Sequence, residues 1–284
     1  MTRTVLATTV LTVLSSGSVT AAIITTSTSG ANAAAIQSTV DAYRASLGTL
    51  NPNTPGSVGS GRREINWDGV PAQFSSPNLL PPDFFNVNSP RGVVLSTPGT
   101  GLLVSANEDP NTPQTEARFG DINATYPTIF QVFSPQKLFA ARGSTTTDVN
   151  FFVAGSNTPA TVSGFGAVFT DVDLADVTSL EFFDASNASL GKFFVPTFDG
   201  GLSFLGITVG AGDPRIARVR VTAGNTPLGP NDTATADVVA MDDFIYGEPI
   251  AADAGVPEPS TWVLFSSAFA LTVAGLRRRN RNKK

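Results

Sequence analysis

Residues 164–222 read GFGAVFTDVDLADVTSLEFFDASNASLGKFFVPTFDGGLSFLGITVGAGDPRIARVRVT. Short runs of β-branched and aromatic residues alternate in this stretch with Gly, Asp, Asn and Pro. If residues 215–222 form a strand, Val219 and Val221 face one side and Arg218 and Arg220 face the other. Strands of this length, separated by turn residues about every 8–12 positions, are typical of an all-β sandwich or jelly roll.

The same pattern extends to both sides of this stretch, while helical periodicity is weak outside the two ends of the chain. The 20 Phe residues give such a core its bulk. We therefore predict one all-β domain, a β-sandwich of jelly-roll-like form, at residues 62–249. Strands are expected at 148–153, 165–170, 179–184, 191–195, 202–209, 215–222 and 237–246.

The composition excludes several classes of function. The 284 residues include no His and no Cys. The chain therefore has no Ser-His-Asp triad, no cysteine nucleophile, no ordinary zinc site and no disulfide.

The N-terminus has the three parts of a secretory signal. Arg3 supplies a charge, residues 5–13 are apolar, and small residues follow, with cleavage positions at Ala21 and at 31–33. We predict a signal peptide at 1–33, with a helical apolar part. A Ser-, Thr-, Pro- and Gly-rich flexible linker is expected at 34–61, where 37–47 could hold a short helix.

The C-terminus also has three parts. After a spacer at 250–256, Val256 leads into Pro257-Glu258-Pro259, and residues 262–276 carry no charge. A helix of this length covers roughly 22 Å and can span a thinned bilayer. We predict a single transmembrane helix whose basic end lies in the cytoplasm. That end carries Arg277, Arg278, Arg279, Arg281, Lys283 and Lys284.

Residues 257–284 resemble the PEP-CTERM sorting signal of exopolysaccharide-producing Gram-negative bacteria, in motif, apolar span and arginine cluster. The resemblance implies export, transient anchoring in the inner membrane, processing by an exosortase, and a final place at the cell surface or in the extracellular matrix. Residues 164–248 are similar in layout to galactose-binding-like jelly rolls, which often close on an Asp-Asp-aromatic strand, as at Asp242-Asp243-Phe244. In such folds a closing-strand aspartate often ligates a structural calcium, and Asp242 matches that position.

The exported body is strongly acidic. Without Arg3, the six basic tail residues and Glu258, it retains 11 basic and 22 acidic residues, a net charge of −11. This charge disfavours nucleic acid as a partner and favours association with cations.

Two carboxylates in 164–222 are candidate metal ligands. Asp171 and Asp173 offer hard oxygen atoms of the kind calcium prefers, with Asp242 or Asp243 of the last strand as a further ligand. The spacing does not fit an EF-hand loop. The alternative is that these aspartates only form turns and solvate strand ends. The same carboxylates also permit a glycosidase pair, because i and i+2 on a strand share a face.

Two further groups are candidate ligand-binding residues. Trp67, next to Asp68, offers the aromatic face and carboxylate of a sugar site, although a core tryptophan is the more common role. Arg218 and Arg220 could bind acidic sugars, or could neutralise acids on adjacent strands.

From these residues we expect a non-enzymatic surface or matrix protein, sorted by an exosortase and associated with exopolysaccharide, with no certain cofactor. One alternative is a calcium-supported, lectin-like carbohydrate-binding module. A carboxylate glycosidase is the third.

Overall fold

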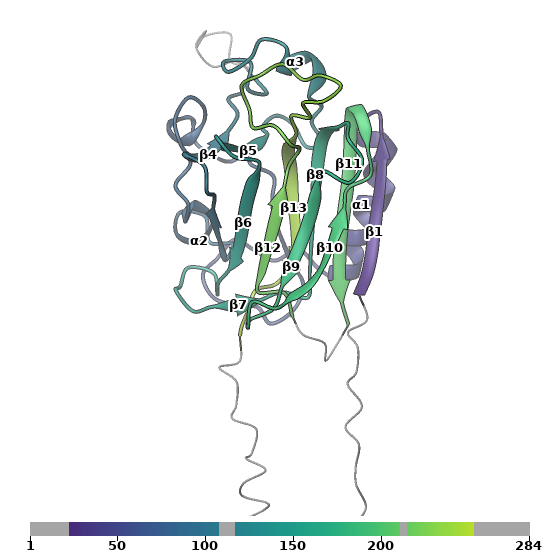
Figure 1. Ribbon diagram of the computed structural model, residues 1–284. Helices are drawn as coiled ribbons and strands as arrows, with labels where there is room; N and C mark the ends of the chain where they lie inside the picture. The colour runs from purple at the N-terminus through teal and green to yellow at the C-terminus, as the bar shows by residue number, and fades with distance from the viewer. Residues whose placement is uncertain (1–22, 108–116, 211–214, 253–284) are drawn as a thin grey trace, which may run out of the picture.

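The computed structural model describes residues 23–107, 117–210 and 215–252, which fold into two antiparallel β-sheets packed face to face (Figure 1). The larger sheet has the strand order β1-β11-β8-β13-β5-β4, with β2 also paired to β13. The smaller sheet has the order β10-β9-β12-β6-β3, and β14 pairs with β7. The predicted all-β sandwich is confirmed, while its jelly-roll form stays a prediction.

The larger sheet consists of β1 (Ile23–Gly30), β2 (Arg62–Ile65), β4 (Gly101–Val104), β5 (Phe139–Arg142), β8 (Gly164–Val172), β11 (Phe198–Val209) and β13 (Ala240–Gly247). The smaller consists of β3 (Val93–Ser96), β6 (Thr146–Phe151), β9 (Ser179–Phe183), β10 (Ser189–Phe194) and β12 (Arg218–Thr222). The remaining elements are β7 (Ala160–Thr161), β14 (Ile250–Ala251), α1 (Ala33–Leu47), α2 (Phe84–Val87), α3 (Tyr126–Ile129) and a 3-10 turn at Ala72–Phe74.

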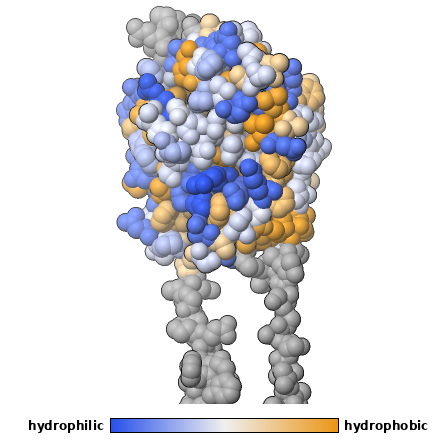
Figure 2. Space-filling model, in the orientation of Figure 1, coloured by the Kyte–Doolittle hydropathy of each residue, from blue (hydrophilic) through white to orange (hydrophobic). Residues whose placement is uncertain are grey.

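The main core lies between the two sheets, and alternation along each strand decides which side chains enter it. In β12, Val219 and Val221 are buried, whereas Arg218 and Arg220 lie on the outer face. Val219 stands opposite Val149 of β6 in the register, so neighbouring strands present apolar residues at the same level. Figure 2 shows hydrophilic residues gathered over β12 and β9 on this outer face.

Strand β8 differs from β12 because all nine of its residues are buried. Phe165, Ala167 and Phe169 belong to the core between the sheets. Val168 packs in a second cluster on the opposite face of the larger sheet. Both faces of the central strands are therefore covered, which explains why β8 is a nearly continuous apolar run rather than an alternating one.

Helix α1 provides part of this second cover, so the flexible linker predicted at 34–61 is wrong. Asn32 caps the helix by accepting a hydrogen bond from the amide of Ala35 at 3.2 Å. Tyr43 meets the ring of Phe204 edge-on at 5.2 Å and donates a hydrogen bond to the carbonyl of Ile207 at 3.0 Å. The buried stripe of the helix is Ile36, Val40, Tyr43 and Leu47, at helical spacing.

The rest of the expected linker is held by a buried ion pair. Arg63 and Glu248 are both buried, and two guanidinium nitrogens donate to the two carboxylate oxygens at 2.7 and 2.8 Å. Arg63 also donates to the carbonyls of Thr54, Gly56 and Pro90. The pair thus joins residues 54–56 to the end of β13, and the domain does not begin at residue 62.

The first and last described residues enter the fold at the same end of the sandwich (Figure 1). Ile23 stands opposite Val209, and β14 follows directly after β13. The predicted boundaries at 33 and 249 therefore need correction, because β1 and β14 both pair with other strands. The apolar signal segment at 5–13 and the sorting signal at 257–284 lie outside the described residues. Among the described residues, no helix is long and apolar enough to cross a membrane.

Trp67 is a core residue and not a surface ligand site. Its side chain is 1% exposed and stacks on Phe139, with ring centroids 4.2 Å apart. Phe85 and Phe244 meet it edge-on. The indole nitrogen donates to the carbonyl of Asp242 at 2.7 Å, so both the rings and the polar atom of the side chain are used inside the protein.

We predict that Trp67→Ala lowers the free energy of unfolding by about 3–5 kcal/mol, because it leaves a cavity among three aromatic rings. Denaturant unfolding followed by circular dichroism measures this. Phe194→Ala is the matched control, since that ring is 43% exposed and its removal should cost about 0.5 kcal/mol or less. A similar loss for the two variants would contradict the assigned role of Trp67.

Candidate metal site

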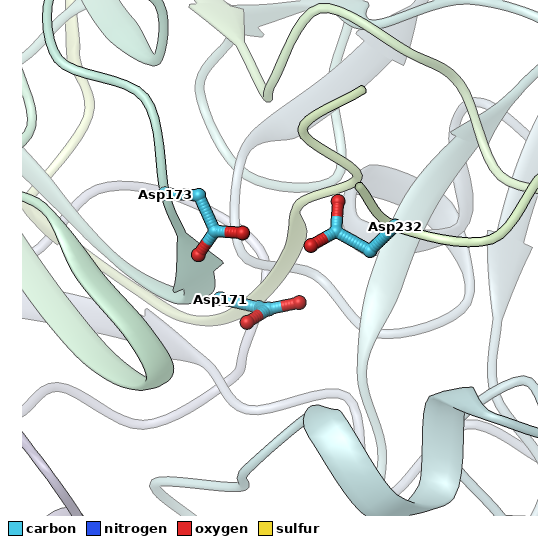
Figure 3. Close-up of side chains that lie close together, drawn as sticks. All are labelled: Asp171, Asp173 and Asp232. Atoms are coloured by element: carbon cyan, nitrogen blue, oxygen red, sulfur yellow. The ribbon is translucent and has the colours of Figure 1, made fainter. Parts of the chain in front are cut away.

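Three aspartates meet at the end of the sandwich where β8 finishes. Asp171 and Asp173 lie at the end of β8, and Asp232 lies in the loop between β12 and β13. One carboxylate oxygen from each residue lies within 4.8 Å of the other two. Figure 3 shows the three side chains pointing toward one another, Asp171 and Asp173 from the end of β8 and Asp232 from the loop.

The antiparallel order of the central strands brings these segments together. Thr170 of β8 stands opposite Ala240 of β13 on one side and Leu202 of β11 on the other. Residues that follow β8 therefore lie beside residues that precede β13 and residues at the start of β11. The loop at 223–239 and the segment at 198–201 consequently meet at the end of β8.

A bulge in β11 fits around Asp171. Phe198 pairs with Val172 and Leu202 with Thr170, so three residues of β11 stand opposite Asp171 alone. The amide of Gly200 in this bulge donates to Oδ1 of Asp171 at 2.8 Å. Asp171 itself has φ +65°, a left-handed conformation that aspartate tolerates better than most residues.

The position of Asp232 is fixed by bonds to its own loop and to the segment around α3. Oδ1 of Asp232 accepts a hydrogen bond from the amide of Val238 at 3.0 Å. The side chain of Asn231, the preceding residue, accepts a hydrogen bond from the side-chain amide of Asn123 at 2.8 Å. The hydroxyl of Tyr126 donates a hydrogen bond to the backbone carbonyl of Pro230. The acidic triad is thus built from packed segments.

The triad contains buried oxygen atoms that have no hydrogen-bond partner. Asp171 is 1% exposed, and its Oδ2 is unpartnered; Oδ1 of Asp173 is also buried and unpartnered. A buried carboxylate oxygen without a partner is costly, and native structures usually satisfy it with a proton donor, a water or an ion. These two oxygens therefore mark a place where a positively charged group fits.

The pKa values of the triad carboxyl groups also indicate that a positively charged group fits at this place. The pKa of Asp171 is raised to about 7, mainly by burial and also by the carboxylates of Asp232, Asp199 and Asp237, against the opposing hydrogen bond from Gly200. Burial and the adjoining Asp232 raise the pKa of Asp173 to about 8. Negative charge at the triad is thus unfavourable without a cation.

The structure separates Asp242 from this group, in contrast to the predicted set of Asp171, Asp173 and Asp242. Oδ2 of Asp242 accepts from the amide of Phe133 at 2.6 Å, and its Oδ1 bonds to the hydroxyl of Ser134 at 3.1 Å. Its neighbour Asp243 forms an ion pair with Arg44 of α1 at 2.8 Å. Burial raises the pKa of Asp242 well above its ordinary value. Asp242 therefore helps to fasten the outer cover of the sheet.

The other predicted ligand residues are also used inside the fold. Asp68 accepts hydrogen bonds from the amides of Gln136 and Lys137. Arg218 and Arg220 both bond to Asp148 on the adjacent strand β6, at 3.1 and 2.8 Å. The arginines thus neutralise a neighbouring acid, which is the second of the two roles considered from the sequence.

Asp232 was missed because it lies about 60 residues from Asp171 along the chain. A signal for it does exist. If the last strand runs antiparallel to β8, the residues beside the end of β8 precede that strand rather than lie within it. The loop before β13 holds Asp232 and Asp237, and Asp237 accepts bonds from the amides of Asp173 and Leu174 at 3.4 and 3.3 Å.

No protein-family model, curated protein or solved structure matches this chain. The chemistry of the site therefore follows from its own residues. Three converging carboxylates could hold a metal ion. Because all the side-chain ligands are oxygen atoms, they suit a hard cation rather than a soft, thiolate-preferring metal.

We predict that the metal-free protein becomes less stable as the pH rises from about 5 to about 8. The folded-state pKa values of Asp171 and Asp173, about 7 and 8, lie above the ordinary aspartate value. A carboxyl group whose pKa is higher in the folded than in the unfolded state contributes its full stabilisation below about pH 4. That contribution is lost as the pH rises through the folded-state pKa. Thermal midpoints measured with a chelator across this range test the prediction.

Asp171→Asn should flatten this pH dependence, because the amide cannot ionise. Asp148→Asn is the control, since Asp148 is paired with arginines on the smaller sheet, and it should keep the wild-type slope. Equal slopes for wild type and Asp171→Asn would show that the triad does not titrate as described.

Proposed function

We propose that this protein is an exported calcium-binding β-sandwich without enzymatic activity, sorted by an exosortase to the cell surface or extracellular matrix, where it associates with exopolysaccharide. The observation that carries the calcium part is the buried, unpartnered Oδ2 of Asp171, directed into a cluster with Asp173 and Asp232.

Calcium suits this site better than magnesium. Calcium accepts six to eight oxygen ligands in flexible geometry, whereas magnesium requires near-ideal octahedral geometry and retains its waters. The site combines carboxylates from a strand end and a loop, and Asp173 and Asp232 are half-buried. Solvent or a bound ligand can therefore complete the coordination.

The position of the triad suits display away from a membrane. The described chain enters and leaves at the Ile23 and Ala251 end, and the triad lies at the opposite end of β8. If the C-terminal segment anchors the protein in transit, as its resemblance to PEP-CTERM signals implies, the metal site faces outward. Exopolysaccharide association rests on the same resemblance.

A calcium-supported lectin is the second candidate. The half-buried Asp173 and Asp232 favour it, because a partly exposed calcium has coordination positions that sugar hydroxyls can occupy. A glycosidase is disfavoured by the third carboxylate. The two carboxyl groups of a glycosidase stand about 5–9.5 Å apart on either side of the scissile bond, whereas the triad oxygens lie within 4.8 Å of one another, a closeness that attracts a cation.

We predict that calcium raises the thermal midpoint and that a chelator lowers it, because a ligand bound only by the folded state stabilises that state. The gain is about 2.7 kcal/mol when free calcium is one hundred times its dissociation constant. Asp232→Asn should abolish the calcium-dependent shift, and Asp148→Asn should retain it. Superimposed melting curves with calcium and with chelator would refute calcium binding.

The sorting part has a separate test. Replacing Pro257, Glu258 and Pro259 with alanines should leave the full-length chain in the inner membrane, whereas the wild-type chain is cut near the motif and leaves that membrane. Cell fractionation with mass measurement of the C-terminus distinguishes the two states. Asp253→Ala, just outside the motif, should be processed normally, and normal processing of the triple-alanine variant would contradict the proposal.

A further inference from the structure

Strand β1 is the outermost strand of the larger sheet, at the right of Figure 1. It pairs with β11 alone among the described residues, in an unbroken register of eight residue pairs. Alternate residues of an edge strand turn their N–H and C=O groups away from the sheet. Within residues 23–107, 117–210 and 215–252, no second strand pairs with the outer backbone groups of β1.

The sequence of β1, IITTSTSG, has none of the features by which edge strands normally avoid pairing with other chains. It has no charged residue, no proline and no bulge, and Ile24 is 61% exposed. Thr and Ser side chains that stand opposite each other on neighbouring antiparallel strands pair favourably. The strand is thus uncharged within a body of net charge −11.

The other outermost strands are protected. The opposite edge of the larger sheet, β4, is covered by a preceding segment, whose residues Ser76 and Leu80 donate amide hydrogen bonds to carbonyls of β4 at 2.7 and 2.9 Å. In the smaller sheet, Leu95 of β3 donates to the carbonyl of Pro82. Strand β10 has a bulge at 189–191 and carries Lys192. Only β1 lacks such protection among these four edges.

We propose that β1 is an interaction surface for a second copy of this chain, with the two β1 strands paired antiparallel about a two-fold axis. A two-fold axis normal to the sheet pairs the strand with itself and keeps both copies of α1 on the same face, which extends the larger sheet across both chains. The rotation keeps each side chain on its original face of the sheet, and opposite residues of an antiparallel pair share a face. The axis therefore lies between the two copies of one residue of β1, which stand opposite each other.

The surroundings of β1 leave room for this arrangement. Helix α1 packs beside β1 on the outer face of the sheet, so the two helices also approach each other. The exposed positions of α1 are small, apart from Asp41, which is paired with Arg44; they are Ala34, Ala35, Ser38, Ala42, Ala45 and Ser46. Small side chains at these positions do not hold the second chain away from the sheet edge.

The absence of cysteine in the chain allows a direct test by single-cysteine cross-linking. Thr25, Thr26, Ser27 and Thr28 are replaced by cysteine one at a time in the full-length chain, in mild detergent, and disulfide dimers are measured after oxidation. Residues opposite each other in an antiparallel pair have Cα atoms about 4.5–5.5 Å apart, within disulfide range. One position at the axis should therefore cross-link much faster than its neighbours. Ser189→Cys on the protected strand β10 is the control.

A second variant tests the same contact by repulsion. The two residues that flank the reactive position are replaced by lysine in the single-cysteine chain; for a register centred on Thr26 these are Thr25 and Ser27, which then stand opposite each other and are both exposed. Cross-linking at the reactive position should fall roughly tenfold, with an unchanged thermal midpoint.

Three results would overturn the proposal: rates no higher than at Ser189→Cys, equal rates at all four positions, or dimers that persist in the lysine variant. An adduct with the mass of another protein would assign the edge to that protein and likewise overturn it. None of these readouts depends on calcium.

Discussion

The burial of β8 on both faces is the constraint on which the rest of the structure depends. In a sandwich whose outer face meets solvent, strands alternate between buried and exposed side chains, but all nine residues of β8 are buried. Its outer face must therefore be covered by elements outside the sandwich. Helix α1 covers one part, and the segment that includes Tyr126, Phe130 and Leu138 covers another part of the sheet.

The polar groups that fasten this cover are themselves buried. Asp242 and Asp243 lie in a register shift of β13, where two consecutive side chains reach the segment at 133–134 and Arg44 of α1. Arg63 and Glu248 do the same for residues 54–56. Removing one partner from such a pair leaves an uncompensated buried charge, so these contacts fix the positions of the covering segments. The aspartates of the closing strand thus serve the fold.

The triad of Asp171, Asp173 and Asp232 differs from these pairs, because the charged groups that act on its buried carboxyl groups are themselves acidic. The groups that act on Asp171 electrostatically are further aspartates. The acidic pair of Asp242 and Asp243, by contrast, is neutralised by a basic residue of the protein, because Arg44 forms an ion pair with Asp243. At the end of β8 the neutralising charge has to come from protons or from a cation, which is why this cluster and not the other is the candidate site.

Much of the sandwich could be predicted from alternation, since β12 and most of β11 fall where the sequence places strands. Helix α1 was read only as a short helix within a linker, although Ile36, Val40, Tyr43 and Leu47 recur at helical spacing. The Ala- and Ser-rich residues between them resemble a linker in composition, and only the outer face of β8 and β11 gives that stripe a partner. Two of the three triad residues could be predicted, because Asp171 and Asp173 lie close together in the sequence, whereas Asp232 reaches them only through the pairing of β8 with β13.

The pairing of β1 also bears on maturation of the chain. Of the two cleavage positions that the N-terminal sequence offers, the one at 31–33 would remove β1 and separate α1 from the strand that precedes it. It would uncover the edge of β11, whose residues Leu202–Ile207 are buried. Cleavage after Ala21 leaves β1 complete as the first element of the mature protein. If the N-terminus is a signal peptide, the pairing of β1 with β11 therefore favours the earlier position, because cleavage there leaves this part of the sheet intact.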